Sequence, residues 1–151
     1  MISEAAARRA EQWIAAAVSR GAEVVAGGGR RGAILEPTVL ARTKPDDQVN
    51  CEEVFAPVTT VTAYDDFDTA LRAVNASRYG LQAGVFTRDI ARLMRAWDRL
   101  DVGGVMGNEV PSWRVDRMPY GGTKASGVGR EGVRFAIDEM TELRLLTLSI
   151  E

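Results

Sequence analysis

The chain has 151 residues, of which 46% are hydrophobic and 26% are charged, and its formal net charge is −2. This composition is typical of one globular domain and argues against an intrinsically disordered chain. The acidic balance argues against nucleic acid as a partner, because surfaces that bind nucleic acid carry an excess of Lys and Arg. The apolar runs are too short to span a bilayer, so we expect no membrane partner.

The chain contains one cysteine and no histidine. One cysteine excludes an intrachain disulfide and a thiolate-rich zinc site. Without histidine, Ser-His-Asp and Cys-His arrangements and imidazole metal sites are excluded. We therefore expect no metal site. Residues 1–9 also lack the order of a signal peptide, which together with the cysteine count predicts a cytoplasmic location.

Helical and strand patterns alternate from the start of the chain. Apolar residues at helical spacing predict a helix from Ser3 to about Arg20, with Ser3 as the N-cap. Residues 23–26 and 57–64 are predicted strands, and residues 33–40 are predicted to be extended. Gly27 to Gly29 lack the spacing of a dinucleotide-binding loop and predict a plain turn.

The alternation continues beyond residue 64. Asp65 and Asp66 are predicted to cap a helix that begins at Phe67, and Thr87 to cap a helix with Ile90 in its first turn. The other predicted elements are strands at 81–86, 102–106 and 141–148, a helix at 130–140 and a long loop at 108–125. Strands that alternate with helices predict an α/β fold with a mostly parallel sheet and flanking helices.

The most specific motif runs from Met118 to Gly132 and reads Met-Pro-Tyr-Gly-Gly-Thr-Lys-Ala-Ser-Gly-Val-Gly-Arg-Glu-Gly. It resembles the P-[FY]-G-G-x-K-x-S-G-x-G-R-E signature near the C-terminal end of NAD(P)-dependent aldehyde dehydrogenases. Part of it is superficially similar to a phosphate-binding loop. Thr123, however, stands where such a loop needs glycine before the lysine, so no phosphate cradle is expected.

Further segments resemble the same family, in the same order, over essentially the whole chain. They are Gly21-Ala22 to Gly28, Pro37 to Leu40, Glu52 to Val58, Asn75 to Asp89, Gly103 to Asn108 and Met140 to Arg144. The resemblance implies that residues 1–139 are the C-terminal half of an aldehyde dehydrogenase catalytic domain. It implies that residues 140–151 are an oligomerisation strand and tail.

The segment Glu52-Glu53-Val54-Phe55-Ala56-Pro57-Val58 is the candidate cofactor site. From the residues alone it is an acidic turn before a strand, with Phe55 in the core and the glutamates in water. It resembles the family's E-E-x-F-G-P-V element, with Ala56 at the usual glycine. The resemblance implies that Glu53 accepts hydrogen bonds from the nicotinamide-ribose hydroxyls of NAD or NADP. It implies that Phe55 packs against the nicotinamide.

Cys51 is not expected to be a nucleophile. The family's catalytic cysteine lies in an F-x-x-x-G-Q-x-C context, which does not occur in this sequence. Two neighbouring carboxylates, Glu52 and Glu53, would also disfavour a thiolate. We therefore assign no catalytic residue to this chain.

The predicted loop at 108–125 occupies the place of the family's substrate funnel. Trp113 is predicted to line a small pocket, and Arg114 or Arg117 to pair with an anionic group on the aldehyde. The alternative is a surface cluster in which Asp116 lies between the two arginines. The loop is most similar to members that act on short hydroxylated or anionic aldehydes.

The resemblance implies an enzyme that oxidises an aldehyde to a carboxylic acid with NAD or NADP and assembles as a homo-oligomer, a dimer or tetramer. The family's catalytic cysteine and general-base glutamate precede the segments found here, so the isolated chain is expected to be inactive. Two alternatives stay open. The chain could be a non-catalytic assembly module that pairs through residues 141–148, or one half of a split enzyme completed in trans.

Overall fold

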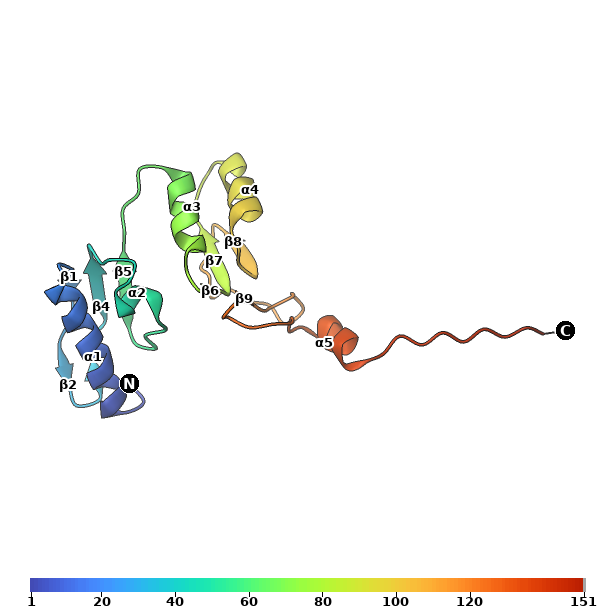
Figure 1. Ribbon diagram of the computed structural model, residues 1–151, viewed down its shortest axis with the longest axis horizontal. Coiled ribbons are helices and arrows are strands. Elements are labelled where there is room, and N and C mark those ends of the chain that lie inside the picture. The colour runs from blue at the N-terminus through green and yellow to red at the C-terminus, as the bar shows by residue number, and fades with distance from the viewer. Residues whose placement is uncertain (151) are drawn as a thin grey trace. The chain divides into compact units, whose positions relative to one another are not determined.

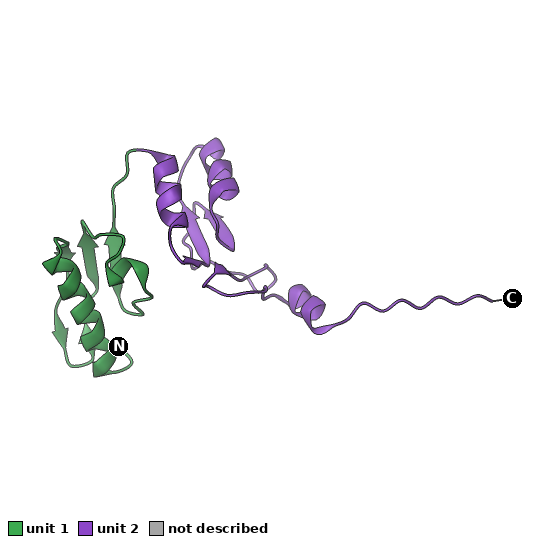
Figure 2. Cartoon of the chain, viewed as in Figure 1, with its two compact units in different colours: residues 1–65 green, residues 66–151 purple. Residues whose placement is uncertain are grey.

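The computed structural model describes residues 1–150, which fall into two compact units. Unit 1 comprises residues 1–65, and unit 2 begins at Asp66 (Figure 2). Each unit combines helices with short strands, so the predicted α/β class is confirmed.

Unit 1 begins with helix α1, Glu4–Ser19 (Figure 1). The Ser3 side chain accepts a hydrogen bond from the Ala6 amide, which confirms Ser3 as the N-cap. One face of α1 carries small and branched apolar residues that are buried against the sheet of this unit. They are Ala7, Ala10, Ile14 and Ala17.

The sheet of unit 1 has the order β1-β4-β5, formed by Glu23–Ala26, Thr38–Ala41 and Val58–Val61. Strand β1 is antiparallel to β4, whereas β4 and β5 are parallel. Two short elements were not predicted. Strands β2 (Arg30–Arg31) and β3 (Ile34–Leu35) form a hairpin, and helix α2 (Gln48–Cys51) lies between β4 and β5. Both are too short to produce a periodic apolar pattern.

Unit 2 contains helices α3 (Phe67–Asn75) and α4 (Ile90–Arg99) beside a parallel pair of strands, β7 (Gln82–Val85) and β8 (Gly104–Gly107). A second, antiparallel pair joins β6 (Tyr79–Gly80) to β9 (Thr123–Lys124). The described strands pair in both directions: β4–β5 and β7–β8 are parallel, whereas β1–β4, β2–β3 and β6–β9 are antiparallel. The parallel pair β7–β8 is joined by a crossover that contains α4, as parallel strands require, whereas the antiparallel pair β2–β3 is joined by a short turn.

The N-cap of α4 is a correction to the sequence prediction. Asp89, not Thr87, caps this helix, and its carboxylate accepts from the amides of Ala91 and Arg92 at 2.9 and 3.3 Å. The Thr87 hydroxyl instead accepts from the Asp89 amide at 3.1 Å. The cap of α3 was predicted correctly, because Asp66 accepts from the Thr69 amide at 2.8 Å.

The end of the chain also differs from the prediction. Helix α5 is Val133–Met140, and its N-cap is Gly132, so it begins three residues later than expected. Residues 141–150 form no strand in the part of the chain that the structure describes, and their side chains are exposed. A strand exists only where a neighbouring strand shares its hydrogen bonds, and residues 1–150 contain no such partner for this segment. The assignment of residues 140–151 to oligomerisation stays a prediction.

Candidate cofactor and substrate site

Glu53 and Phe55 lie on the turn between α2 and β5, and both side chains are exposed. Phe55 is 81% exposed, so its expected place in the core is wrong. Its φ is 51°, in the left-handed region that residues other than glycine rarely adopt. This backbone carries the ring outward, beside an exposed carboxylate two residues away. The turn therefore presents an aromatic face and a hydrogen-bond acceptor to whatever lies over it.

Hydrogen bonds from unit 1 hold the backbone of this turn. The Arg9 guanidinium of α1 donates to the Val54 carbonyl at 3.1 Å, and the Thr38 amide of β4 donates to the Pro57 carbonyl at 2.8 Å. The Val58 amide closes the turn by donating to the Ala56 carbonyl at 2.7 Å. The turn is thus fixed from both sides, which suits a surface on which a ligand is oriented.

Arg20 joins the end of α1 to the start of α2. Its Nε lies 3.0 Å from the buried carboxylate of Asp47, and its Nη2 donates to both oxygens of Asp46 at 2.6 Å. The hydrogen bond from Arg20 lowers the pKa of Asp46 below its ordinary value. Because α2 leads directly into the Glu53 turn, this ion pair also positions the candidate site.

Cys51 ends α2 and is half-buried, and its thiol lies 3.8 Å from the Asp46 carbonyl. The Arg20 guanidinium interacts electrostatically with this thiol, while two carboxyl side chains, Glu52 and Glu53, follow it directly along the chain. That Cys51 is no nucleophile stays a prediction.

The three predicted substrate residues lie in unit 2, on the stretch between β8 and β9. Trp113 is 44% exposed, and its carbonyl accepts from Gln82 Nε2 at 3.4 Å. The Arg114 guanidinium lies over the Tyr120 ring at 4.3 Å and is paired with Glu131 at 2.9 Å. Arg114, Asp116 and Arg117 are all exposed, so the alternative of a surface cluster stays open, although the described ion pair of Arg114 is with Glu131. Arg117 is exposed and has no ion pair within the described residues.

The Arg114 guanidinium is thus bound by two partners, Tyr120 and Glu131. The Arg117 guanidinium has no ion pair within the described residues and can bind an anion. A guanidinium stacked on tyrosine and paired with a carboxylate fixes the loop more than it offers a free cation. Of the two arginines, Arg117 is the better candidate for an anionic group on a substrate.

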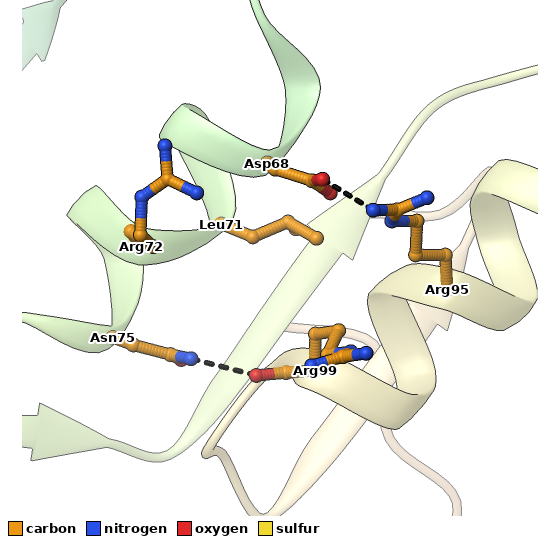
Figure 3. Close-up of a pocket in the computed structure, with 6 residues that line it drawn as sticks. All are labelled: Asp68, Leu71, Arg72, Asn75, Arg95 and Arg99. Atoms are coloured by element: carbon orange, nitrogen blue, oxygen red, sulfur yellow. Dashed lines mark hydrogen bonds and ion pairs between the residues drawn. The ribbon is translucent and has the colours of Figure 1, made fainter.

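A pocket of about 330 Å³ lies between α3 and α4 in unit 2 (Figure 3). It is lined by Asp68, Leu71, Arg72, Asn75, Arg95 and Arg99. Arg95 is paired with Asp68 across it, and Asn75 Nδ2 donates to the Arg99 carbonyl at 2.6 Å. The other two arginines pair with carboxylates that do not line the pocket, Arg72 with Asp66 and Arg99 with Asp98, so the pocket does not have the convergent free donors of a ligand site.

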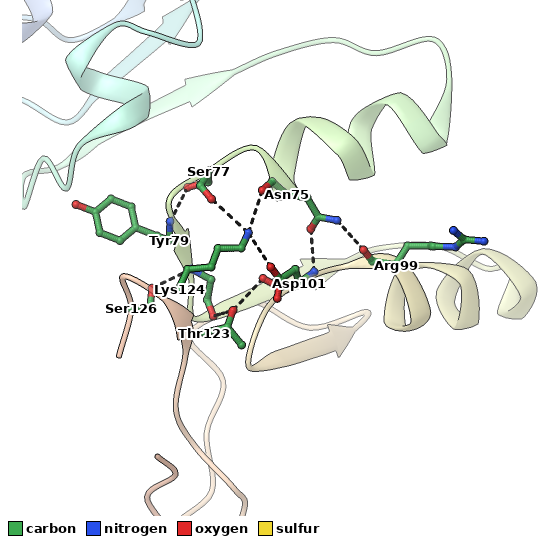
Figure 4. A network of polar contacts seen from close by, with 9 residues as sticks. Asn75, Ser77, Tyr79, Arg99, Asp101, Thr123, Lys124 and Ser126 are labelled. Atoms are coloured by element: carbon green, nitrogen blue, oxygen red, sulfur yellow. Dashed lines mark hydrogen bonds and ion pairs between the residues drawn. The ribbon is translucent and has the colours of Figure 1, made fainter. Parts of the chain in front are cut away.

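Sequence reasoning missed the role of the lysine in the signature motif. The Lys124 ammonium donates to the carbonyls of Asn75 and Ser77 at 2.9 and 3.2 Å, and it lies 3.5 Å from the Asp101 carboxylate (Figure 4). The ammonium is therefore bound by groups of the protein itself. One signal was present in the sequence: Lys124 and Lys44 are the two lysines of a chain in which the other basic residues are arginine.

Comparison with known proteins identifies the family. The model of the aldehyde dehydrogenase family matches residues 1–146. The chain belongs to this family. It is 45% identical over 150 residues to a 3-sulfolactaldehyde dehydrogenase of Priestia aryabhattai, covering 99% of the chain and 31% of the relative.

Solved aldehyde dehydrogenases share the fold. Aldehyde dehydrogenase 21 from Physcomitrella patens, in complex with the reaction product succinate, matches with a TM-score of 0.91 and 44% identity. The match covers 94% of this chain and 30% of that one. A glyceraldehyde-3-phosphate dehydrogenase from Methanocaldococcus jannaschii, complexed with NADP, matches with a TM-score of 0.87 and 35% identity, over 93% of this chain and 30% of that one.

The chain therefore spans about a third of the length of the aldehyde dehydrogenases that it matches. The expectation that it corresponds to one part of such an enzyme is confirmed. The residues described as cofactor and substrate contacts stay predictions. No helix among residues 1–150 is long and apolar enough to cross a membrane.

Proposed function

We propose that this chain supplies the nicotinamide-facing part of an NAD(P)-dependent aldehyde dehydrogenase that oxidises an aldehyde to a carboxylic acid. The observation that carries the proposal is the outward, left-handed placement of Phe55 beside the exposed Glu53. A strained backbone that exposes a large aromatic ring is unfavourable in a free protein and is typical of a site where the ring meets a ligand.

The two side chains suit the nicotinamide end of the cofactor. The Glu53 carboxylate can accept from two vicinal ribose hydroxyls, and the face of Phe55 can confine a planar ring. When bound, the cofactor accepts the hydride from the substrate. The role of this chain's residues is to orient the ribose and to keep the ring in one plane, which reduces the entropy lost on reaching the reactive geometry.

A short, hydroxylated or anionic aldehyde is the substrate class that the site supports best. Arg117 has no partner among the described residues and can attract an anionic group, while Trp113 offers a partly exposed aromatic wall. The names of the similar relatives, which include 3-sulfolactaldehyde and lactaldehyde dehydrogenases, support the same class.

The chain by itself is proposed to lack turnover and to work in the cytoplasm within a homo-oligomer, a dimer or a tetramer. The oligomer is supported by five exposed apolar side chains in residues 141–150, which would be covered by strand pairing with another subunit. They are Leu143, Leu145, Leu146, Leu148 and Ile150. An assembly module or one half of a split enzyme would present the same surface.

A kinetic experiment separates these possibilities. The 151-residue chain is first assayed alone with NAD or NADP and lactaldehyde, and we expect no formation of NADH or NADPH. The matching part of the Priestia aryabhattai relative is then replaced by this chain. An active hybrid supports the enzymatic role. Turnover by the chain alone would contradict the proposed need for residues outside it, and an inactive, folded hybrid would favour the assembly module.

The active hybrid allows the cofactor residues to be tested. Removing the ring with Phe55→Ala, or the charge with Glu53→Gln, should lower kcat/KM for the cofactor by roughly tenfold each, equivalent to about 1.4 kcal/mol. Tyr64→Ala is the matched control, because Tyr64 is also an exposed aromatic of unit 1, 60% exposed. If Phe55→Ala and Glu53→Gln behave like Tyr64→Ala, the proposed cofactor site is wrong.

A further inference from the structure

Lys124 combines a strained backbone conformation with a side-chain ammonium that has hydrogen-bond and ion-pair partners. Its φ is 55°, although it is neither glycine nor asparagine. Its side chain is 21% exposed and reaches the end of helix α3. A left-handed residue of this kind persists only where its surroundings hold it in place.

The acceptors around the ammonium account for its position. The carbonyls of Asn75 and Ser77 have no further helical partner, because α3 ends at Asn75. The Asp101 carboxylate adds a negative charge at 3.5 Å. A positive charge at the C-terminal end of a helix is also favoured by the helix dipole. The three N–H groups of the ammonium thus match three oxygens.

These acceptors fit lysine better than arginine. An ammonium is a compact charge with three donors that diverge, whereas a guanidinium is a flat fork that suits two parallel acceptors. The oxygens of Asn75, Ser77 and Asp101 come from three positions of the chain and surround a point (Figure 4). Other ion pairs of the described residues, such as Arg20–Asp46 and Arg114–Glu131, use arginine, so the three acceptors here are the reason that we give for a lysine at this position.

The residues beside Lys124 strengthen the same attachment. The Thr123 hydroxyl donates to the Asp101 carbonyl at 3.1 Å, and the Gly80 amide of β6 donates to the Ser126 hydroxyl at 3.0 Å. The Ala125 amide donates to the Arg78 carbonyl at 3.0 Å. The signature segment is therefore bound to the α3–β6 corner by side chains and backbone together.

The other end of the preceding loop is fixed separately. Asn108 also has a φ of 55°, its amide donates to the Val85 carbonyl at 2.8 Å, and its side-chain oxygen accepts from the Thr87 amide at 2.8 Å. Residues 109–122, which we call the 109–122 loop, are thus held between two left-handed residues whose side chains bond across the chain. This loop contains Trp113, Arg114 and Arg117.

We propose that Lys124 is a positioning residue, whose ammonium clips the far end of the 109–122 loop to the end of α3 and so sets where Trp113 and Arg117 lie. The clip itself is independent of the proposed function. Its consequence for aldehyde binding rests on that function. Loss of the ammonium should loosen the loop at its far end, where the hydrogen bonds of Thr123, Ala125 and Ser126 remain, while Asn108 keeps the near end attached.

Tryptophan fluorescence tests the clip in the 151-residue chain itself. The chain has three tryptophans, Trp13, Trp97 and Trp113, so replacing two by phenylalanine leaves one reporter. Because Trp113 is 44% exposed, loosening of the loop in Lys124→Met should raise its acrylamide quenching constant, with about twofold as the limit that full exposure would give. Lys124→Arg should not restore the wild-type value. Lys44→Met, which removes the other lysine, should leave Trp113 quenching unchanged.

The Trp97 reporter distinguishes positioning from general loosening of unit 2. Under the proposal, Lys124→Met changes quenching at Trp113 but not at Trp97 on α4. Equal changes at both tryptophans, no change at Trp113, or full rescue by arginine would each overturn it. Should Lys124→Met fail to fold, Asp101→Asn removes one acceptor's charge, and a smaller rise at Trp113 is expected. An unchanged Trp113 in folded Asp101→Asn would then count against the clip.

A measurement on the unaltered chain gives an independent test. In limited reaction with acetic anhydride, Lys124 should be acetylated several-fold more slowly than Lys44, because hydrogen-bonded amines react more slowly than free ones. Equal rates for the two lysines would contradict the bound ammonium. In the active hybrid, Lys124→Met should raise KM for the aldehyde and leave KM for the cofactor unchanged. Should the clip be confirmed while Glu53→Gln and Phe55→Ala have no effect, the proposed function fails and the clip stands.

Discussion

Unit 1 buries more apolar side chains than unit 2 does, although it also leaves several exposed, Phe55 and Tyr64 among them. The core of unit 1 joins residues from α1, α2 and the strands. Its buried members are Ala10, Ile14, Ala17, Ala22, Leu35, Leu40 and Val49. The core of unit 2 has three buried members, Leu71, Ala96 and Leu100. Helix α5 has no buried residue, and Trp97 of α4 is 66% exposed.

This difference shows that the two units are stabilised in different ways. Unit 1 has enough buried apolar surface to make the hydrophobic effect its main source of stability. Unit 2 has a smaller buried core, and side chains that bond to the backbone, such as Asn75, Thr123 and Lys124, join its elements. Large uncovered apolar surfaces are typical of sites that another part of a protein or another subunit covers. The exposed apolar surface of unit 2 is therefore typical of a surface that contacts another part of a protein or another subunit.

The largest effect is expected from the core of unit 1. Leu40 is fully buried in β4, so Leu40→Ala should destabilise unit 1 by about 2–5 kcal/mol, through lost burial and the cavity left behind. Urea unfolding followed by Trp13 fluorescence measures it. Leu143→Ala is the matched control, because Leu143 is fully exposed, and its effect should stay within about 0.5 kcal/mol. Similar effects of the two changes would contradict the comparison of the units.

A smaller effect is expected at the start of α4. Asp89→Ala removes the carboxylate that caps two amides, so it should destabilise unit 2 by about 1 kcal/mol. Thr87→Ala should cost less, since the Thr87 hydroxyl accepts from a single amide before the helix. Thermal unfolding followed by Trp97 fluorescence ranks the two variants. A larger loss of stability in Thr87→Ala than in Asp89→Ala would mean that Thr87 is the main N-cap of α4.

The cap of α3 should make stability depend on pH. Hydrogen bonds from Thr69 lower the pKa of Asp66 below its ordinary value of 3.8. A lowered pKa in the folded state stabilises the fold above pH 3.8 and loses this contribution as the pH falls through the folded value. The stability difference between the wild type and Asp66→Ala should therefore be constant from pH 7 to about 5 and shrink below pH 3.8. A stability difference between the wild type and Asp66→Ala that grows at low pH would contradict the lowered pKa of Asp66.

The smallest effect is expected at Phe55. Its left-handed backbone costs about 1 kcal/mol for a residue other than glycine, while glycine loses a similar amount in backbone entropy on folding. Phe55→Gly should therefore change the stability of unit 1 by less than about 1 kcal/mol, because the exposed ring contributes little burial. Guanidinium unfolding followed by Trp13 fluorescence measures the change. A loss of several kcal/mol would mean that the ring stabilises the fold and is no ligand surface.

Local features of the fold were predictable from the sequence. Ser3 and Asp66 cap the helices that they were expected to cap, because an N-cap depends on a side chain and an amide three residues away. The cap of α4 was misassigned by two residues, since Thr87 and Asp89 are both suitable and only the backbone geometry separates them. The strand expected at 141–148 is absent because no described segment offers it a hydrogen-bonding partner.

The sequence by itself determined the family, the α/β class and the places of the main helices, since ordered motifs and apolar periodicity are properties of nearby residues. Only the tertiary structure decided that Phe55 is exposed, that Arg114 pairs with Glu131, and that Lys124 of β9 binds the end of α3. The partners of Arg114 and Lys124 lie 17 and 49 residues away along the chain. Which distant groups meet depends on how the elements pack, and no pattern within one segment contains that information.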